Sequence, residues 1–284
     1  MPSRPLGTMI TYGYARIPLA SELELARQLG AEVVEILPDW RVFPDPRPLL
    51  ALVSDRGLAI HSAHGCWGGQ AIRANRVDLG QTHPAGHRES VDDLKRCIDW
   101  LETAGGKYLV VHPGGLSLPE HRDSRRESLA RGLLELDEHA AGSKVVVCVE
   151  NMPPGVYPGS RMGEIHALLR ELDRPRLALA LDTGHAHISS DLHDETMAAG
   201  ALLATTHVHD NDGRKDSHDP PGRGTIDWTL WANSLDLVGY DGPIMLECVR
   251  QLRDDPTLFR GDVLAPLTGK SPHFPTGSRT GCSE

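Results

Sequence analysis

The sequence predicts an α/β fold in which eight parallel strands and their helices close into a single (β/α)8 barrel. Eight short runs of apolar, mostly β-branched residues recur along the 284 residues, and helix-period segments separate most of them. This alternation indicates a parallel sheet with both faces covered, because each connecting helix packs back onto the sheet. Eight such units are the number that closes a barrel, and the chain has an ordinary length for this fold.

The expected strands are these eight apolar runs. Each is five to seven residues long, which is the usual length of a strand. They lie at residues 8–12, 32–36, 57–61, 108–112, 144–150, 176–182, 204–210 and 243–247.

The expected helices lie between or after the strands. In the first of them Leu23, Ala26 and Leu29 fall on one face, and Ser21 followed by Glu24 forms a capping box. Ser160, which precedes a run with Glu164, is the expected N-cap of the helix predicted at 160–172. The helices are predicted at 21–30, 88–104, 119–141, 160–172, 191–203, 228–238 and about 256–267.

The domain organisation follows from these elements. Residues 1–267 are expected to form the barrel as one catalytic domain, and residues 268–284, rich in Gly, Ser and Pro, a flexible tail. An open, doubly wound sheet is the alternative fold. No G-x-G-x-x-G or Walker loop follows any strand, which disfavours that alternative.

Composition disfavours several classes of protein. With 29 Lys+Arg against 39 Asp+Glu the net charge is −10, so the chain would repel nucleic-acid phosphates. No apolar run approaches the roughly 18 residues that span a bilayer, and no signal peptide opens the chain. Five scattered cysteines without a C-x-x-C pair suit a reducing compartment. We therefore expect a cytoplasmic protein with no membrane or nucleic-acid partner.

Imidazoles and carboxylates follow the apolar part of six consecutive strands. Strand ends of a barrel share one face with the loops that form its active site. One such residue alone is an ordinary cap or hydrogen-bond partner, but charged groups are rarely buried unless paired or bound to a metal. A set without thiolates suits zinc, manganese, cobalt, iron or magnesium. The strand-end candidates are His64 (with His61 as an alternative), His112, Glu150, Asp182, His185, His209 and Glu247.

A polar loop after the seventh strand adds two candidates. Residues 207–228 are too rich in charge, Gly and Pro for regular structure, and they contain Asp216 and His218. A carboxylate and an imidazole two residues apart in a loop can both reach one ion, although a solvated charged loop is the simpler interpretation. His207 and His209 share a strand face by the period of two, and the terminal His209 is the better candidate ligand.

Taken together, these segments resemble the xylose-isomerase-like TIM-barrel superfamily. The group contains sugar and sugar-phosphate isomerases and epimerases, inosose dehydratases and the endonuclease IV group. The resemblance rests on VVHPGG (110–115), VVCVENMP (146–153), LALDTGHAH (179–187), the loop 207–228 and PIMLE (243–247). It implies the four metal ligands of the sugar isomerases and epimerases at Glu150, Asp182, His209 and Glu247. It implies the additional ligands of members that hold three zinc ions at His64, His112, His185, Asp216 and His218.

The chain also departs from the endonuclease IV pattern. It has DTGHAH where those proteins have a DTCHAF-type motif, and HDNDG where they have a lysine after H-L-N-D. No basic cluster that could hold a bent duplex is present. The sequence pattern of residues 216–228 is more similar to that of the sugar-phosphate isomerase and epimerase group.

Charge separates the candidate chemistries. The nine candidate ligands include four carboxylates, so one divalent ion leaves the site at −2 and three ions leave it at +2. With one ion, the resemblance implies an isomerase, epimerase or related dehydratase of a small sugar or cyclitol. Glu150 and Glu247 would then exchange a proton through an enediolate, with His185, Arg223 and Trp67 contacting the substrate.

Two other functions remain open at this point. A hydrolase or phosphoesterase with two or three zinc ions is the main alternative, and three ions would attract a phosphate. A non-catalytic sugar-binding barrel would leave most of the ligands unused. A homo-oligomer is compatible with any of these functions.

Overall fold

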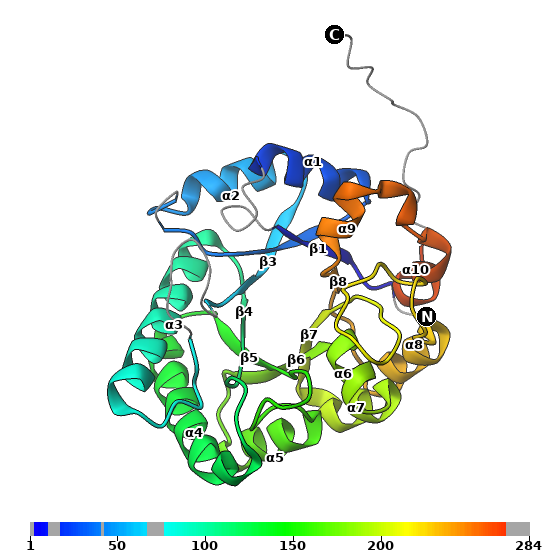
Figure 1. Ribbon diagram of the computed structural model, residues 1–284. Helices are drawn as coiled ribbons and strands as arrows, with labels where there is room; N and C mark the ends of the chain where they lie inside the picture. Colours follow the sequence, from blue (N-terminus) through cyan, green and yellow to red (C-terminus); the bar gives the residue numbers. More distant parts are fainter. Residues whose placement is uncertain (1–2, 11–17, 41–42, 67–76, 271–284) are drawn as a thin grey trace.

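The computed structural model describes residues 3–10, 18–40, 43–66 and 77–270. Within them eight parallel strands surround a central axis, and helices form an outer ring (Figure 1). The strands are β1 (Leu6–Ile10), β2 (Val33–Ile36), β3 (Ala59–His64), β4 (Tyr108–Val111), β5 (Val146–Glu150), β6 (Leu177–Asp182), β7 (Leu203–His207) and β8 (Ile244–Leu246).

The sheet closes into a barrel. Its strand order is β7-β6-β5-β4-β3-β2-β1-β8, so consecutive strands from β1 to β7 pair with one another and β1 also pairs with β8. The gap between β7 and β8 is bridged at Val208 and Leu246, and the Val208 amide donates a 2.8 Å hydrogen bond to the Met245 carbonyl. The predicted (β/α)8 barrel is thereby confirmed.

Helices cover the outer face of the barrel (Figure 1). Two of them, α6 and α9, begin directly after β6 and β8 and therefore lie at the mouth. Among the described residues no helix combines the length and hydrophobicity needed to cross a bilayer. The helices are α1 (Leu19–Gln28), α2 (Arg47–Ser54), α3 (Pro84–Ala104), α4 (Arg122–His139), α5 (Met162–Leu172), α6 (Thr183–Ser189), α7 (Leu192–Ala199), α8 (Trp228–Leu237), α9 (Val249–Asp254) and α10 (Gly261–Thr268).

Apolar side chains form two separate layers. The larger core lies between strands and helices, while a small cluster of Val110, Cys148, Ala178 and Ala180 fills the barrel interior. Side chains alternate between these layers along each strand, because neighbouring residues of a strand point to opposite faces. Cys148 in β5 and Ala180 in β6 point inward, so the residues two positions further along these strands, Glu150 and Asp182, also point inward, at the mouth of the barrel.

The structure shifts several expected boundaries. The third strand extends to His64, so this residue belongs to the strand instead of following it. The seventh ends at His207, which leaves His209 two residues beyond it. Helix α1 begins at Leu19 without a side-chain cap, so the capping box predicted at Ser21 was wrong. The N-cap predicted at Ser160 was also wrong, because α5 begins at Met162 and its N-cap residue, Arg161, makes no side-chain cap hydrogen bond.

Three short helices were not expected from the sequence: α2, α6 and α9. Their six to eight residues hold too few turns for a clear hydrophobic period. Of the tail expected at 268–284, residues 271–284 lie outside the described part of the chain.

Candidate functional site

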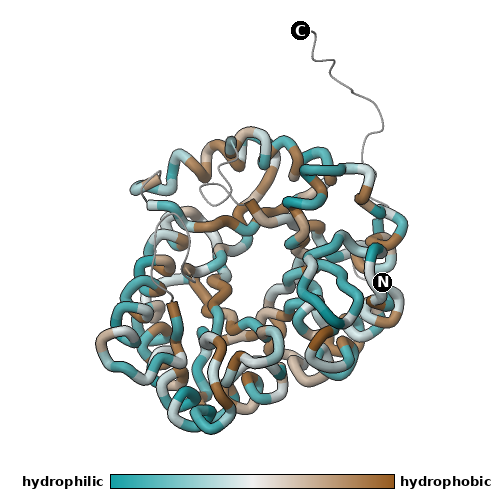
Figure 2. Tube along the Cα trace, viewed as in Figure 1, coloured by the Kyte–Doolittle hydropathy of each residue, from teal (hydrophilic) through white to brown (hydrophobic). Residues whose placement is uncertain are grey.

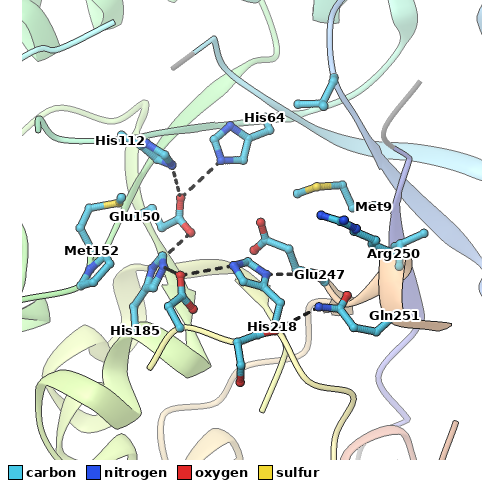
Figure 3. A pocket seen from close by; sticks show the side chains of 15 residues that line it. Met9, His64, His112, Glu150, Met152, His185, His218, Glu247, Arg250 and Gln251 are labelled. Carbon is cyan, nitrogen blue, oxygen red and sulfur yellow. Dashed lines mark hydrogen bonds and ion pairs between the residues drawn. The ribbon is translucent and has the colours of Figure 1, made fainter. Parts of the chain in front are cut away.

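A cavity of about 510 Å³ opens at the mouth of the barrel, where the C-terminal ends of the strands meet (Figure 3). Seven of the nine ligands predicted from the sequence line it: His64, His112, Glu150, His185, Asp216, His218 and Glu247. The other two, Asp182 and His209, are completely buried and interact with the lining residues. The structure therefore brings the whole predicted set to one place.

The strand period positions two buried carboxylates of the site. Glu150 follows Cys148 on the inward face of β5, and Asp182 follows Ala180 on the inward face of β6. Asn151 joins these strand ends: its side-chain amide donates to the Asp182 carbonyl at 3.0 Å, and its oxygen accepts from the Asp182 amide at 2.7 Å. The backbone that carries both acids is thus fixed from two sides.

Two imidazoles approach the same oxygen of Glu150. The Nε2 atoms of His64 and His112 lie 3.5 and 3.3 Å from Oε2 of this carboxylate. The two rings meet edge to face with centroids 4.9 Å apart. These three residues offer ligand atoms that all lie within 4.8 Å of one another, which is close enough to share one ion.

A second group surrounds Asp182. One oxygen of this carboxylate accepts the backbone amide of His185 at 2.7 Å and so caps helix α6. The other oxygen lies 3.0 Å from Nε2 of His209. The imidazole of His209 packs against the backbone at Gly184, where a Cβ atom would fall 1.9 Å from its Cε1. Only glycine leaves room for this histidine.

The polar loop after β7 supplies the third group, which includes Asp216 and His218. Oδ2 of Asp216 lies 3.2 Å from Nε2 of His185 and 3.3 Å from Nε2 of His218. Figure 2 shows this loop as a hydrophilic segment beside the barrel mouth. It is anchored by the buried Asp210, which accepts hydrogen bonds from the Gly222 amide at 2.9 Å and the Trp228 indole at 3.1 Å.

A fourth group includes a histidine that the sequence interpretation ranked below His209. Nδ1 of His207 lies 2.9 Å from Glu150 Oε1 and 3.1 Å from Glu247 Oε2. Its Nε2 lies 2.8 Å from Glu35, an inward residue of β2. Glu35 follows an apolar run as the other candidates do, but no sequence motif distinguishes it from an ordinary partner in a salt bridge.

Charge and burial shift the protonation of this site. Burial alone would lower the pKa of His185, but Asp182 and Asp216 outweigh it and raise the pKa to about 10. Against the same cost of burial, Asp216 raises the pKa of His218 to about 10. Burial opposes ionisation of Asp182, yet His185 and His209 lower its pKa to about 2. Without a cation the site therefore balances its acids with imidazolium groups.

Three of the imidazoles are oriented as metal ligands are. Histidines that bind a metal donate the other ring N–H to a carbonyl or carboxylate, which turns the second nitrogen to the ion. Nδ1 of His64 faces the Gly65 carbonyl at 2.8 Å, that of His185 the Asn151 carbonyl at 2.9 Å, and that of His218 the Glu247 carbonyl at 3.2 Å. In all three, Nε2 is left facing the carboxylates.

Orphaned polar atoms also fit a divalent cation. Buried polar atoms in folded proteins are nearly always hydrogen-bonded. Four in this site make no hydrogen bond, although three of them have ion-pair neighbours: Glu150 Oε2, His209 Nδ1, Asp216 Oδ1 and Glu247 Oε2. The donor set of imidazoles and carboxylates matches zinc, manganese, cobalt or magnesium.

Two substrate contacts were predicted outside this set, and one of them, Arg223, is not among the described residues that line the cavity. Arg223 is exposed, and its guanidinium donates a hydrogen bond to the Thr257 carbonyl at 3.4 Å. Trp67 lies outside the described residues. His61, the alternative to His64, lines a separate cavity with residues that begin the strands, at the opposite end of the barrel.

Other lining residues were not anticipated. Met9, Leu37 and Met152 give the cavity an apolar side, and Arg250 and Gln251 of α9 complete its wall. Figure 3 shows Arg250 beside Met9, with its side chain extending toward Glu247. A helix placed immediately after β8 by the barrel topology brings these residues here, and no sequence motif marks them.

Comparison with known proteins agrees with this architecture. The family model described as xylose isomerase-like TIM barrel matches residues 23–263. Fructoselysine 3-epimerase of Shigella flexneri is 25% identical over 271 residues, covering 90% of this chain and 94% of that protein.

Two further matches extend the range of relatives. A probable endonuclease 4 of Mycoplasma mobile is 31% identical over 150 residues, which cover 48% of this chain and 51% of that protein. The crystal structure of a D-tagatose 3-epimerase-like protein superposes with a TM-score of 0.74 at 17% identity, covering 93% of this chain and 98% of the other. At that identity the structural likeness shows the shared fold.

Proposed function

The chain belongs to the xylose isomerase-like TIM-barrel family, and on this premise we propose that it is a divalent-cation-dependent isomerase or epimerase of a sugar or cyclitol. One observation carries the proposal: Glu150 and Glu247 approach each other at the cavity, and their ligand atoms and that of Asp182 lie within 4.8 Å of one another. Nε2 of His209 lies 3.0 Å from Asp182. Two acids beside one small cavity are the groups needed to remove and return a proton.

Four residues would hold the cation: Glu150, Asp182, His209 and Glu247. When bound there, the cation supplies positive charge that stabilises the enediolate form of a hydroxycarbonyl substrate. The orphaned atoms of Glu150, His209 and Glu247 support this assignment.

Glu150 and Glu247 also handle the proton. One carboxylate accepts the proton from the carbon next to the carbonyl, and the other returns a proton to the same or the neighbouring carbon. Which carbon is protonated, and from which side, decides between isomerisation and epimerisation. At rest the acid that accepts the proton must be ionised and the acid that returns one must be protonated, so the pair carries one proton. His207 lies 2.9 Å from Glu150 and favours the ionised form of that carboxylate, which makes Glu150 the acceptor.

The remaining lining suits a small polyol. The cavity volume of about 510 Å³ lies within the ordinary range for small-molecule sites. Met9, Leu37 and Met152 would contact the carbon-bound hydrogens, while His185 would orient a hydroxyl group. The fructoselysine 3-epimerase relative supports a sugar epimerase for this chain.

Hydrogen exchange in deuterated water tests this proposal. The protein, loaded with Mn²⁺ or Co²⁺, is incubated with a panel of ketoses and inososes, and deuterium at the carbon next to the carbonyl is followed by NMR. We expect exchange for at least one member of the panel, and none after chelation or in Glu150→Gln. Cation-loaded protein that exchanges no hydrogen on any ketose or inosose would contradict the proposal.

A second function is favoured by a separate observation. Two further groups of ligand type, His64–His112–Glu150 and His185–Asp216–His218, lie in the same cavity and are not needed to hold one ion. They support a phosphoester hydrolase with two or three zinc ions, in keeping with the partial match to a probable endonuclease 4.

The number of bound ions separates the two functions. Protein purified without chelator is analysed for metal by mass spectrometry. About one ion per chain supports the isomerase, and two to three support the hydrolase. His218→Ala should abolish hydrolysis and remove an ion in the second case, whereas it should leave an isomerase with its single ion.

A further inference from the structure

We infer that His207 is a positioning residue, held by Glu35 and Ser62, that fixes the carboxylates of Glu150 and Glu247 from beneath without itself binding the cation. The inference rests on the proposed function, since it concerns how the two proton-handling acids are oriented. It also assigns Glu35 and Ser62, which lie outside the predicted ligand set, to the working of the site.

The contacts of His207 leave no ring nitrogen for an ion. Its Nδ1 lies 2.9 Å from Glu150 Oε1 and 3.1 Å from Glu247 Oε2, and its Nε2 lies 2.8 Å from Glu35 Oε1. Both ring nitrogens therefore face carboxylate oxygens at close range, and an ion at either nitrogen would have to displace one of these contacts.

Glu35 and Ser62 fix the far side of the ring. The Ser62 hydroxyl donates to Glu35 Oε2 at 2.6 Å, which leaves Oε1 for His207. All three side chains are completely buried in the barrel interior. The chain Ser62–Glu35–His207 runs from β3 and β2 to the end of β7 and reaches the acids at the ends of β5 and β8.

His209 differs from His207 in the way a ligand should. Its Nδ1 has no hydrogen-bond partner although it is buried, and its Nε2 points to Asp182 and Asp216 at 3.0 and 3.7 Å. Two histidines separated by one residue are thus divided between two tasks. The deeper one orients the carboxylates and the outer one faces the ion.

This arrangement has a physical purpose. The ligand atoms of Glu150 and Glu247 lie within 4.8 Å of each other, so whenever both carboxylates are ionised their mutual repulsion would rotate them apart. The hydrogen bond between His207 Nδ1 and Glu150 at 2.9 Å, with the ion-pair contact of the same nitrogen to Glu247 at 3.1 Å, opposes this rotation. Loss of such an outer partner typically costs about 10- to 100-fold in activity or metal affinity.

Cation content is the first measurement. His207→Asn and His209→Asn are loaded with Co²⁺, and bound cobalt is counted by elemental analysis. We expect His207→Asn to retain the cobalt of the wild type and His209→Asn to lose at least one ion per chain. Equal loss in the two variants would make His207 a ligand and overturn the inference.

The second measurement combines the visible spectrum of bound Co²⁺ with the steady-state kinetics. In Glu35→Ala we expect a changed cobalt spectrum at full occupancy and a kcat about 10- to 100-fold lower, with KM little changed. Glu35→Gln keeps an acceptor for His207 and should recover part of both. Ser62→Ala should have the smallest effect. A Glu35→Ala protein with the wild-type cobalt spectrum and kcat would overturn the inference.

His87→Asn is the matched control. His87 is a buried histidine whose Nε2 contacts the Ser128 carbonyl at 2.8 Å, outside the cavity. Its replacement should lower the melting temperature without changing the cobalt spectrum, and an equal spectral change in this control would overturn the inference. Because occupancy and spectrum need no turnover, they decide on His207 even if no sugar is converted, in which case only the proposed function fails.

Discussion

Glu150 is the residue on which the charges of the site converge. Its carboxylate has His64 and His112 on one oxygen and His207 on the other. Burial opposes its ionisation, yet the neighbouring imidazoles hold the pKa of Glu150 well below the usual value. An acid kept anionic in a buried cavity can bind a cation or accept a proton.

Glu150→Gln tests this role directly. The amide keeps the shape of the side chain but can neither accept a proton nor bind a cation strongly. We expect activity to fall by at least about 100-fold, the usual contribution of a general acid or base. Glu135→Gln, which changes only an exposed ion pair with Lys95, should leave activity unchanged. A fully active Glu150→Gln protein would contradict both functions proposed for the site.

Arg250 gives a prediction about substrate charge. It lines the cavity and carries the one guanidinium among the described lining residues. A phosphate on the substrate would be attracted to it, whereas a neutral sugar would gain little. Arg250→Gln should therefore raise KM for a ketose phosphate by about 10-fold or more, as expected for loss of a charge-assisted hydrogen bond, and change KM for the matching ketose little.

Arg253→Gln is the control for that comparison. It removes the same charge from the same helix, but the guanidinium pairs with Glu22 and Asp254 and does not line the cavity. Equal effects of Arg250→Gln on both members of the sugar pair would rule out a role in recognising phosphate.

At the scale of elements, helix α6 determines where two predicted ligands stand. It begins at Thr183, directly after Asp182, and Asp182 caps it by accepting the His185 amide. The first turn of this helix therefore fixes Asp182 and His185 relative to each other. Gly184, between them, gives His209 its space.

Gly184→Ala should disturb the site through this contact. The added Cβ would fall 1.9 Å from His209 Cε1, so the imidazole must move. We expect weaker Co²⁺ binding, measured by titration, with an effect as large as that of His209→Ala. Gly163→Ala in α5 meets only the Ala198 Cβ at 4.0 Å and should bind cobalt normally. Wild-type cobalt affinity in Gly184→Ala would show that His209 is not required.

At the scale of the whole molecule, the unbound site couples stability to pH. The pKa of His185 and that of His218 are both raised from 6.5 to about 10, so the stability they contribute is present below about pH 6.5 and lost as the pH rises through 10. The pKa of Asp182 is lowered from 3.8 to about 2, so its contribution is lost only as the pH falls through 2.

Thermal unfolding tests this pH dependence of the protein's stability. In the presence of chelator, the melting temperature should fall between about pH 6.5 and pH 9, because the unfolded chain releases these protons more readily. The stabilisation gained from added Mn²⁺ should increase over the same interval, since the cation needs neutral imidazoles. A chelated protein that becomes more stable toward pH 9 would contradict the charge balance described for the cavity.

Local patterns in the sequence determined the barrel and most of its site. The eight apolar runs and the helices between them specify a parallel sheet, because only that arrangement buries such runs on both faces. The period of two along each strand then placed Glu150 and Asp182 at the mouth. Nine candidate ligands could be named because each follows or ends an apolar run or lies in the polar loop after the seventh.

Only the tertiary structure decided which of these groups meet and what each faces. Glu35 and His207 lie 172 residues apart, and no local pattern couples them. Arg250 enters the cavity because barrel closure brings α9 to its wall, whereas Arg223 turns to the Thr257 carbonyl. Sequence periodicity fixes the face on which a side chain stands, but the partner across the barrel depends on closure of the whole sheet.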